Sequence, residues 1–102
     1  MPENKQLLIS KLNKETAKIS WHELQRFYAQ GRVLYVADQL DLIDVAYQFA
    51  VDNVEQCLFW KEQKLVTAVT DLQASDWYQS EKLLWAVVVA PWVLVQLPHT
   101  TS

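Results

Sequence analysis

The pattern of hydrophobic and polar positions is most distinctive near the carboxyl end, where residues 83–95 read LLWAVVVAPWVLV. This run has no charged side chain, and its only side-chain hydrogen-bond donors are the indoles of Trp85 and Trp92. A strand that is apolar at both odd and even positions must be covered on both faces, so we expect a buried strand. Pro91 lacks an amide hydrogen, so the strand should bulge, bend or lie at a sheet edge there.

The first third of the chain predicts two helices. A sparse apolar stripe in a lysine-rich segment favours an amphipathic helix over about residues 4–17. Ser20 and Glu23 have the spacing of a capping box, in which each side chain accepts a hydrogen bond from the other residue's amide. The second helix should end at Gly31, the single glycine, because a left-handed carboxyl-terminal cap favours a residue without Cβ.

The middle of the chain alternates strand and helix signals. Residues 32–37 are rich in β-branched and aromatic side chains and predict a strand, after which Asp41 can cap a helix that has Asp44 in its first turn. The polar residues 52–55 predict a kink or a new helix that reaches about Gln63.

The remaining segments complete the fold prediction. Residues 65–69 alternate as a strand, and Thr70 with Gln73 can cap another helix before the long apolar strand. The helical connections are long enough for parallel crossovers. We therefore predict an α/β or α+β fold, with a small three-stranded, mainly parallel or mixed sheet covered by four to five helices. One domain over residues 1–102 is expected, with an ordered core over about 7–97 and a polar tail over 98–102.

Composition places the chain among ordinary globular proteins, with 102 residues, 51% hydrophobic and 21% charged. The net charge of −3 is unevenly distributed. Residues 1–32 hold six Lys or Arg and three Glu, a balance of +3, whereas residues 33–102 hold three Lys and nine Asp or Glu, a balance of −6. Because the chain is acidic as a whole, we favour attraction between these regions, within the fold or across a dimer, over binding to nucleic acid.

Several functional classes are disfavoured by what the chain lacks. Cys57 is the single cysteine, so no intrachain disulfide can form, and the polar amino-terminal residues do not resemble a signal peptide. We expect a cytoplasmic protein. The apolar run is shorter than the roughly 20 residues of a membrane helix, which argues against a membrane span. A single glycine excludes the glycine-rich phosphate-binding loops, and no cofactor is predicted.

Three aspartates form the most visible acidic motif. Asp38, Asp41 and Asp44 have the spacing D-x-x-D-x-x-D, and three converging carboxylates could bind a hard cation such as Mg²⁺. Helix capping explains Asp41 and Asp44, and a turn explains Asp38, without any metal. We favour the structural interpretation and predict no metal site.

Two residues are candidates for acid–base or nucleophilic chemistry. His22 carries an imidazole, a side chain often used as a general acid or base, and is adjacent to Glu23, but neighbouring helix positions do not face each other, so an exposed first-turn histidine is favoured. Cys57 has apolar and acidic neighbours in sequence, which favours a buried structural thiol over a nucleophile.

A basic patch is the one feature that suggests nucleic acid. It consists of Lys11, Lys14, Lys18 and Arg26, with Trp21 and Tyr28 close to them in sequence. A solvated helix face explains the same pattern and is the favoured interpretation.

Three segments together resemble a known family. They are ETAKISWHELQRFYAQGRV at residues 15–33, LDLIDVA at 40–46 and LWAVVVAPWVLVQ at 84–96. The chain resembles an uncharacterised family of small bacterial proteins, a domain-of-unknown-function family, over about residues 7–96. The resemblance implies a bacterial cytoplasmic protein and assigns no activity, ligand or catalytic residue.

The function we favour is a noncatalytic interaction or regulatory module that self-associates or binds another protein. A short chain with a two-faced apolar strand has apolar surface to cover, and dimerisation would cover it. Trp77, Trp85 and Trp92 are the candidate interface residues because large aromatic rings anchor interfaces, although core packing is the favoured interpretation for any one of them. The alternatives are a small enzyme that uses carboxylates with His22, and a weak nucleic-acid binder.

Overall fold

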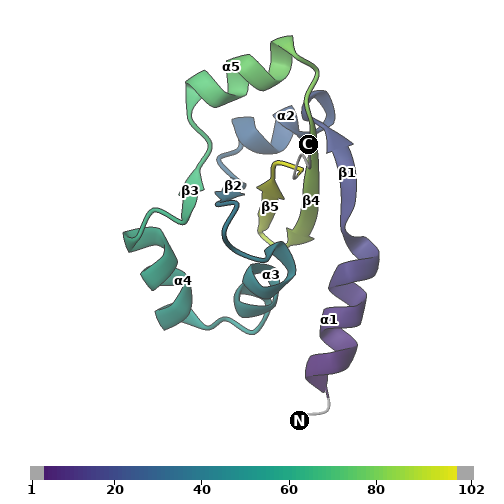
Figure 1. Ribbon diagram of the computed structural model, residues 1–102, viewed down its shortest axis with the longest axis vertical. Coiled ribbons are helices and arrows are strands. Elements are labelled where there is room, and N and C mark those ends of the chain that lie inside the picture. The colour runs from purple at the N-terminus through teal and green to yellow at the C-terminus, as the bar shows by residue number, and fades with distance from the viewer. Residues whose placement is uncertain (1–3, 99–102) are drawn as a thin grey trace.

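The computed structural model describes residues 4–98, which fold into five helices and one five-stranded mixed sheet (Figure 1). The helices are α1 (Asn4–Glu15), α2 (Trp21–Ala29), α3 (Leu42–Ala50), α4 (Val54–Glu62) and α5 (Asp71–Gln79). The strands are β1 (Ala17–Ser20), β2 (Val33–Val36), β3 (Val66–Ala68), β4 (Leu83–Val89) and β5 (Trp92–Gln96). The predicted tail over residues 98–102, including His99, lies almost entirely outside the described residues.

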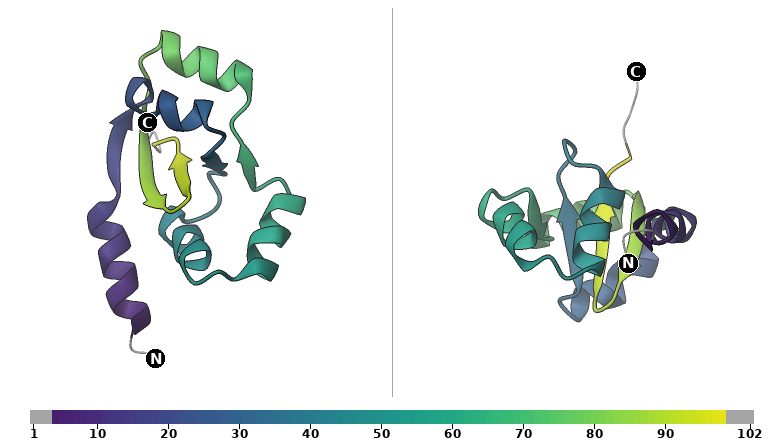
Figure 2. Two further views of the ribbon diagram at one scale, coloured as in Figure 1. Left: turned by 180° about the vertical axis from the view of Figure 1, so that it is seen from behind. Right: turned by 90° about the horizontal axis from the view of Figure 1, so that it is seen from below.

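The sheet has the strand order β1-β4-β5-β2-β3. β5 and β2 run parallel, and the other three neighbouring pairs are antiparallel. The predicted α/β class and the mixed sheet are confirmed, but the prediction of three strands is wrong because the sheet has five. α1 and α4 lie at opposite edges of the molecule, near the edge strands β1 and β3 respectively (Figures 1 and 2).

The long apolar run forms two strands instead of one. Val89 pairs with Trp92 across a tight turn that contains the cis Ala90–Pro91 peptide bond, and the pairing continues to Trp85 opposite Gln96. The bend expected at Pro91 is therefore a complete reversal of the chain. Since Pro91 lies in the turn, neither strand loses a ladder hydrogen bond to it.

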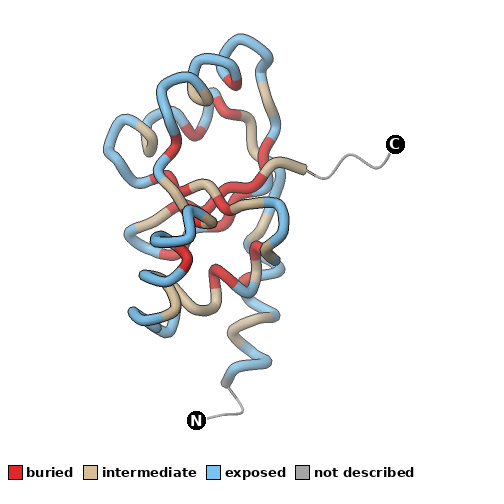
Figure 3. The backbone as a smooth tube through the Cα atoms, turned by 60° about the vertical axis from the view of Figure 1, so that its left-hand side comes forward, coloured by how far each residue is buried: buried red, intermediate tan, exposed pale blue. Residues whose placement is uncertain are grey.

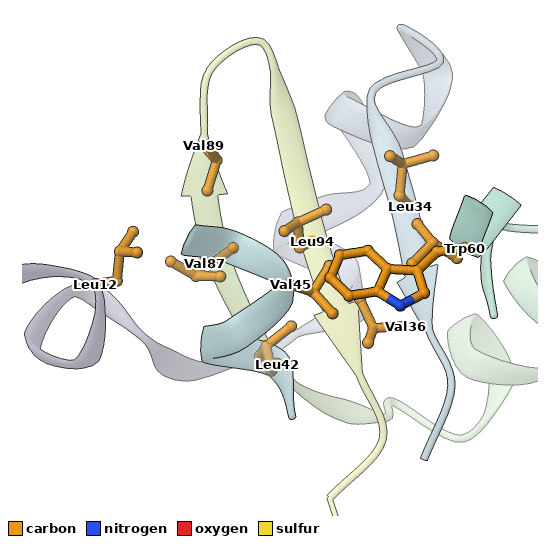
Figure 4. Close-up of a cluster of buried hydrophobic side chains, with 11 residues drawn as sticks. Leu12, Leu34, Val36, Leu42, Val45, Trp60, Val87, Val89 and Leu94 are labelled. Atoms are coloured by element: carbon orange, nitrogen blue, oxygen red, sulfur yellow. The ribbon is translucent and has the colours of Figure 1, made fainter. Parts of the chain in front are cut away.

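Both faces of the sheet are covered, as the apolar run predicts. One cluster packs α1, α3 and α4 on one face (Figure 4): Leu12, Leu34, Val36, Leu42, Val45, Ala46, Trp60, Val66, Val87, Val89 and Leu94. The other packs α2 and α5 on the opposite face: Trp21, Leu24, Val33, Val69, Trp77, Leu84, Ala86, Val93 and Val95. Buried residues concentrate on the strands, and most helix residues are exposed (Figure 3). On β4, Leu83, Trp85 and Val88 remain exposed, so its cover is incomplete.

Four helices end in the same hydrogen-bonded motif. The residue just past the carboxyl-terminal cap has a positive φ: Gly31 (73°), Asp52 (59°), Lys64 (61°) and Glu81 (51°). In each case its amide donates to the carbonyl three residues earlier, and the next amide donates to the carbonyl five residues earlier, which defines a Schellman motif. The role predicted for Gly31 is confirmed, but three of the four motifs use a residue with a side chain.

Of the two capping boxes predicted from the sequence, one forms and the other does not. Thr70 and Gln73 form the predicted capping box, with the Thr70 hydroxyl 3.1 Å from the Gln73 amide. The Ser20 hydroxyl instead accepts from the His22 amide at 3.0 Å, so the box predicted with Glu23 does not form. None of the helices between residues 4 and 98 combines the length and apolar character that a membrane span requires.

Candidate functional site

An apolar helix surface is the clearest candidate site. We define the α4 surface as the side chains of Val54, Glu55, Leu58, Phe59 and Lys61, all of which are exposed. Its three apolar side chains are between 51% and 56% exposed, while Trp60 on the opposite side of α4 packs into the core (Figure 4). A helix with apolar residues on all sides is typically buried, but α4 lies at the edge of the molecule (Figure 1).

A hollow of about 220 Å³ adjoins the α4 surface. It lies between α4 and the β4–β5 turn and is lined by Phe49, Asp52, Val54, Cys57, Leu58, Lys61, Ala90, Pro91 and Trp92. The Lys61 ammonium lies 5.5 Å from the centroid of a Trp92 ring, within cation–π range. The hollow thus combines mainly apolar walls with one basic and one acidic side chain, Lys61 and Asp52.

Cys57 in this hollow is only half-buried, although the sequence predicts a buried thiol. Desolvation raises the pKa of the Cys57 thiol above its ordinary value, and the neighbouring Lys61 ammonium opposes that effect. A raised pKa disfavours the thiolate, which is the nucleophilic form. The structure therefore offers no activation of Cys57.

A second pocket, of about 520 Å³, brings His22 and Glu23 together. Glu15 and Arg26 also line it, and its apolar lining includes Ala86, Val88 and Val93. The His22 Nε2 atom lies 3.0 Å from the Tyr78 carbonyl oxygen, and because a carbonyl can only accept, Nε2 carries the proton. The imidazole also stacks on the Tyr78 ring, with 4.4 Å between centroids. One ring nitrogen of His22 is thus already used in holding α2 against α5.

The remaining acidic candidates lie elsewhere. Asp41 caps α3 as predicted, accepting hydrogen bonds from the amides of Ile43 and Asp44, and Asp38 accepts one from the Tyr35 hydroxyl at 3.2 Å. The sequence suggested His22, Glu23, Asp38, Asp41 and Asp44 as one candidate polar cluster. The structure divides it, because the three aspartates do not line the pocket of His22 and Glu23. Over residues 4–98, no group of three or more His, Cys, Asp or Glu side chains is placed to hold a metal ion.

A third pocket, of about 710 Å³, contains a polar residue that the sequence does not indicate. Gln96 is 6% exposed, and its Nε2 atom donates to the carbonyls of Ala37 (2.9 Å) and Leu40 (2.8 Å). Both partners are acceptors, so the orientation of the carboxamide is fixed. Gln96 thereby fastens the loop between β2 and α3 to the end of β5. Its position directly after the apolar run was the one available signal.

The three candidate interface tryptophans have different environments. Trp77 is 3% exposed, and its ring meets the Trp21 ring nearly edge-on at 5.2 Å between centroids. Trp77 is therefore a core residue and cannot anchor a contact between folded copies. Trp85 is 36% exposed and lines the pocket with Gln96, and Trp92 is partly exposed beside α4. A contact role for Trp85 and Trp92 stays a prediction.

The predicted basic patch is exposed, and two of its four members lie over aromatic rings. The Lys18 ammonium lies 5.2 Å from a Trp85 ring centroid, and the Arg26 guanidinium lies 4.9 Å from that of Phe27. Lys11 and Lys14 lie exposed on α1. Binding of nucleic acid through these residues stays a prediction.

Five helices on a mixed five-stranded sheet define a small α/β protein. The chain belongs to the family DUF2288, "Protein of unknown function", whose model matches residues 7–97. This match confirms the resemblance inferred from the sequence. The chain is also similar to PA1075 from Pseudomonas aeruginosa, whose solution structure was determined by NMR. The two are 41% identical, with a TM-score of 0.79 over 100% of this chain and 94% of that one. No protein with curated annotation matches the chain.

Proposed function

We propose that the protein is a noncatalytic interaction module that self-associates through the α4 surface. The observation that supports this proposal is the exposure of Val54, Leu58 and Phe59 on one helix, next to an apolar hollow. Single exposed apolar residues need no explanation, but a contiguous apolar patch with a polar rim is typical of an interaction site.

A second copy of the chain can cover this surface with the same apolar side chains. Acidic and basic side chains lie at its rim, with Asp52 and Glu55 at the amino end of α4 and Lys61, Glu62 and Lys64 at its carboxyl end. An isologous dimer requires a self-complementary patch, and Val54, Leu58 and Phe59 can pack against their own copies. The proposal therefore names another copy of the same chain as the partner.

The alternative functions have weaker structural support. An enzyme based on His22 and Glu23 has a pocket, but the Nε2 proton of His22 is committed to the Tyr78 carbonyl. Of the basic patch, Arg26 shares its pocket with Glu15 and Glu23, which lowers the local positive potential.

Analytical ultracentrifugation of three proteins tests the proposal. We expect the wild type to dimerise at micromolar concentration and Leu58→Glu to stay monomeric, because the substitution places two like charges at the centre of the interface. Leu72→Glu is the matched control, since Leu72 is 85% exposed on α5, away from the α4 surface. A wild-type protein that is monomeric throughout the micromolar range, or equal effects of the two substitutions, would overturn the proposal.

A further inference from the structure

We infer that the pocket of about 710 Å³ beside Trp85 and Gln96 binds a small molecule that carries a planar amidinium or guanidinium cation. Pockets for small molecules typically enclose about 300–1,000 Å³ and combine apolar walls with a few fixed polar groups. The residues that line this pocket lie outside α4, so the inference does not depend on the proposed self-association.

The pocket lies where the helical cover of the β4–β5 hairpin ends. Trp85 and Gln96 lie directly opposite each other on the two strands. Two residues further along the hairpin, Val87 and Leu94 are at most 1% exposed beneath α1 and α3, whereas Trp85 is 36% exposed. The last pair of the hairpin on this face is therefore left partly uncovered, between the end of α1 and the start of α3.

Gln96 offers the pocket one unpaired acceptor. Both N–H groups of its Nε2 atom are used by the carbonyls of Ala37 and Leu40, so the carboxamide has only Oε1 left, and no donor among residues 4–98 bonds to it. Over the same residues, the one fully buried side-chain polar atom without a partner is the indole nitrogen of Trp21, so Oε1 is accessible. Because Gln96 lines the pocket, a ligand N–H group can supply the missing donor.

Two further polar side chains in the pocket also present acceptors. The Thr16 hydroxyl donates its hydrogen to the Leu12 carbonyl at 2.6 Å and keeps its lone pairs. Asp41 accepts hydrogen bonds from the amides of Ile43 and Asp44 through Oδ1, which leaves Oδ2 for a ligand. The fixed polar groups therefore favour a ligand with several hydrogen-bond donors.

The charge of the pocket favours a cation. Asp41 is its one charged lining residue, and the helix amides that could attract an anion are already bonded to Asp41. Asn13 and Gln39 are exposed amides that can either donate or accept. Trp85 adds an aromatic ring, and the exposed Lys18 ammonium, 5.2 Å from a ring centroid of Trp85, already lies within cation–π range. A planar amidinium or guanidinium can stack on such a ring while its N–H groups reach the acceptors, which an ammonium cannot do.

Titration of the full chain with benzamidine, followed by two-dimensional NMR spectra, tests the site. We expect saturable binding with a dissociation constant of about 1 mM or tighter, and shifts of the Gln96 carboxamide and Trp85 indole signals. Benzamide has nearly the same shape without the charge and should bind at least about tenfold more weakly. No saturation by about 10 mM benzamidine, or equal affinities for the two compounds, would overturn the inference.

Three variants test the role of charge. Asparagine caps helices as well as aspartate does, so Asp41→Asn should keep the start of α3 but weaken benzamidine binding about tenfold. Asp44→Asn is the matched control, since Asp44 lies in the first turn of α3 but does not line the pocket, and it should change the affinity less than about threefold. Lys18→Met removes a competing cation and should tighten binding. Equal effects of the two aspartate substitutions, or weaker binding by Lys18→Met, would contradict the inference.

An arginine side chain of a peptide carries the same cation, and one more compound separates this source from a small molecule. N-acetylarginine methylamide should bind more weakly than benzamidine, because its flexible stem loses more conformational freedom than a rigid ring. Tighter binding of the arginine compound would overturn the small-molecule assignment and favour a peptide ligand instead.

Discussion

Replacing Lys64 by glycine should stabilise the protein, although glycine is the residue that usually weakens a fold. Lys64 follows the cap of α4 with a φ of 61°, and its amide and that of Leu65 close the Schellman motif at that end. Its side chain is exposed, so no buried packing is lost. The substitution removes a Cβ that crowds the backbone in the left-handed conformation.

The expected gain is the difference between two opposing effects. The left-handed region costs a residue with a side chain about 1–2 kcal/mol. Glycine loses more conformational freedom on folding, at a cost of about 0.5–1 kcal/mol. The net stabilisation should be about 0.5–1 kcal/mol, which corresponds to a rise in Tm of a few degrees. Glu81 should behave alike, whereas Asp52 should gain less because aspartate tolerates this conformation better.

Urea unfolding followed by tryptophan fluorescence measures these differences. Gly31→Ala is the reciprocal control: nothing lies within 4 Å of a Cβ built at Gly31, so its expected cost of about 1 kcal/mol comes from the backbone alone. If Lys64→Gly destabilises the protein while Gly31→Ala has no effect, the left-handed conformation is not what limits these helix ends, and the reasoning fails.

Three further predictions concern the hydrogen bonds of Gln96, two tryptophans of different burial, and the hydroxyl of Tyr35. Gln96→Leu should cost about 2 kcal/mol in urea unfolding, because the carbonyls of Ala37 and Leu40 each lose a donor; an unchanged midpoint would refute this. Trp77→Ala should cost about 3–5 kcal/mol and Trp85→Ala about 1 kcal/mol, measured in the same way, and equal costs would contradict their different burial. Burial and the nearby carboxylate of Asp38 raise the pKa of Tyr35 to about 12 from an ordinary 10.0, so its contribution to stability is complete below pH 10 and is lost as the pH rises toward 12. Tyr35→Phe should lessen that decline in unfolding midpoints measured across this pH range, and an identical decline in both proteins would count against it.

The helices could be predicted from the sequence because their ends carry local signals. Asp41 and Thr70 accept the hydrogen bonds that their spacing indicates, and Gly31 adopts the left-handed conformation that its position requires. These interactions join residues a few positions apart. The other left-handed ends, such as Lys64, gave no signal because their residue types are unremarkable there.

The strand count was wrong because strand pairing is not local. β1 has four residues, AKIS, with neither a long apolar run nor a clean alternation, and it is a strand because it pairs with β4. The apolar run has no polar residue to mark a turn, so Pro91 was the only sign of the reversal, and the sequence left its effect open between a bulge, a bend and an edge.

The sequence predicted that the protein has an exposed apolar surface, but it did not predict where that surface lies. The two-faced apolar run in a short chain predicted apolar surface that a partner would cover. Tryptophans were chosen for their size, but the size of a side chain does not determine whether it is exposed. Trp77 became core because α5 packs on α2, a contact between segments far apart in the chain. For the α4 residues, the sequence predicted only a kink or a new helix that reaches about Gln63.

The two-faced apolar run was the original reason to expect self-association, and the structure changes that reason. β4 and β5 pair as a hairpin, and helices on both faces of the sheet bury most of the apolar side chains of these two strands. The chain therefore does not need a second copy to complete this part of its core. α4 is different: Trp60 supplies its main contact with the core, whereas Leu58 and Phe59, each 51% exposed, leave apolar area in water. Substitutions at Trp60 should therefore lower monomer stability more than substitutions at Leu58, which should mainly alter association.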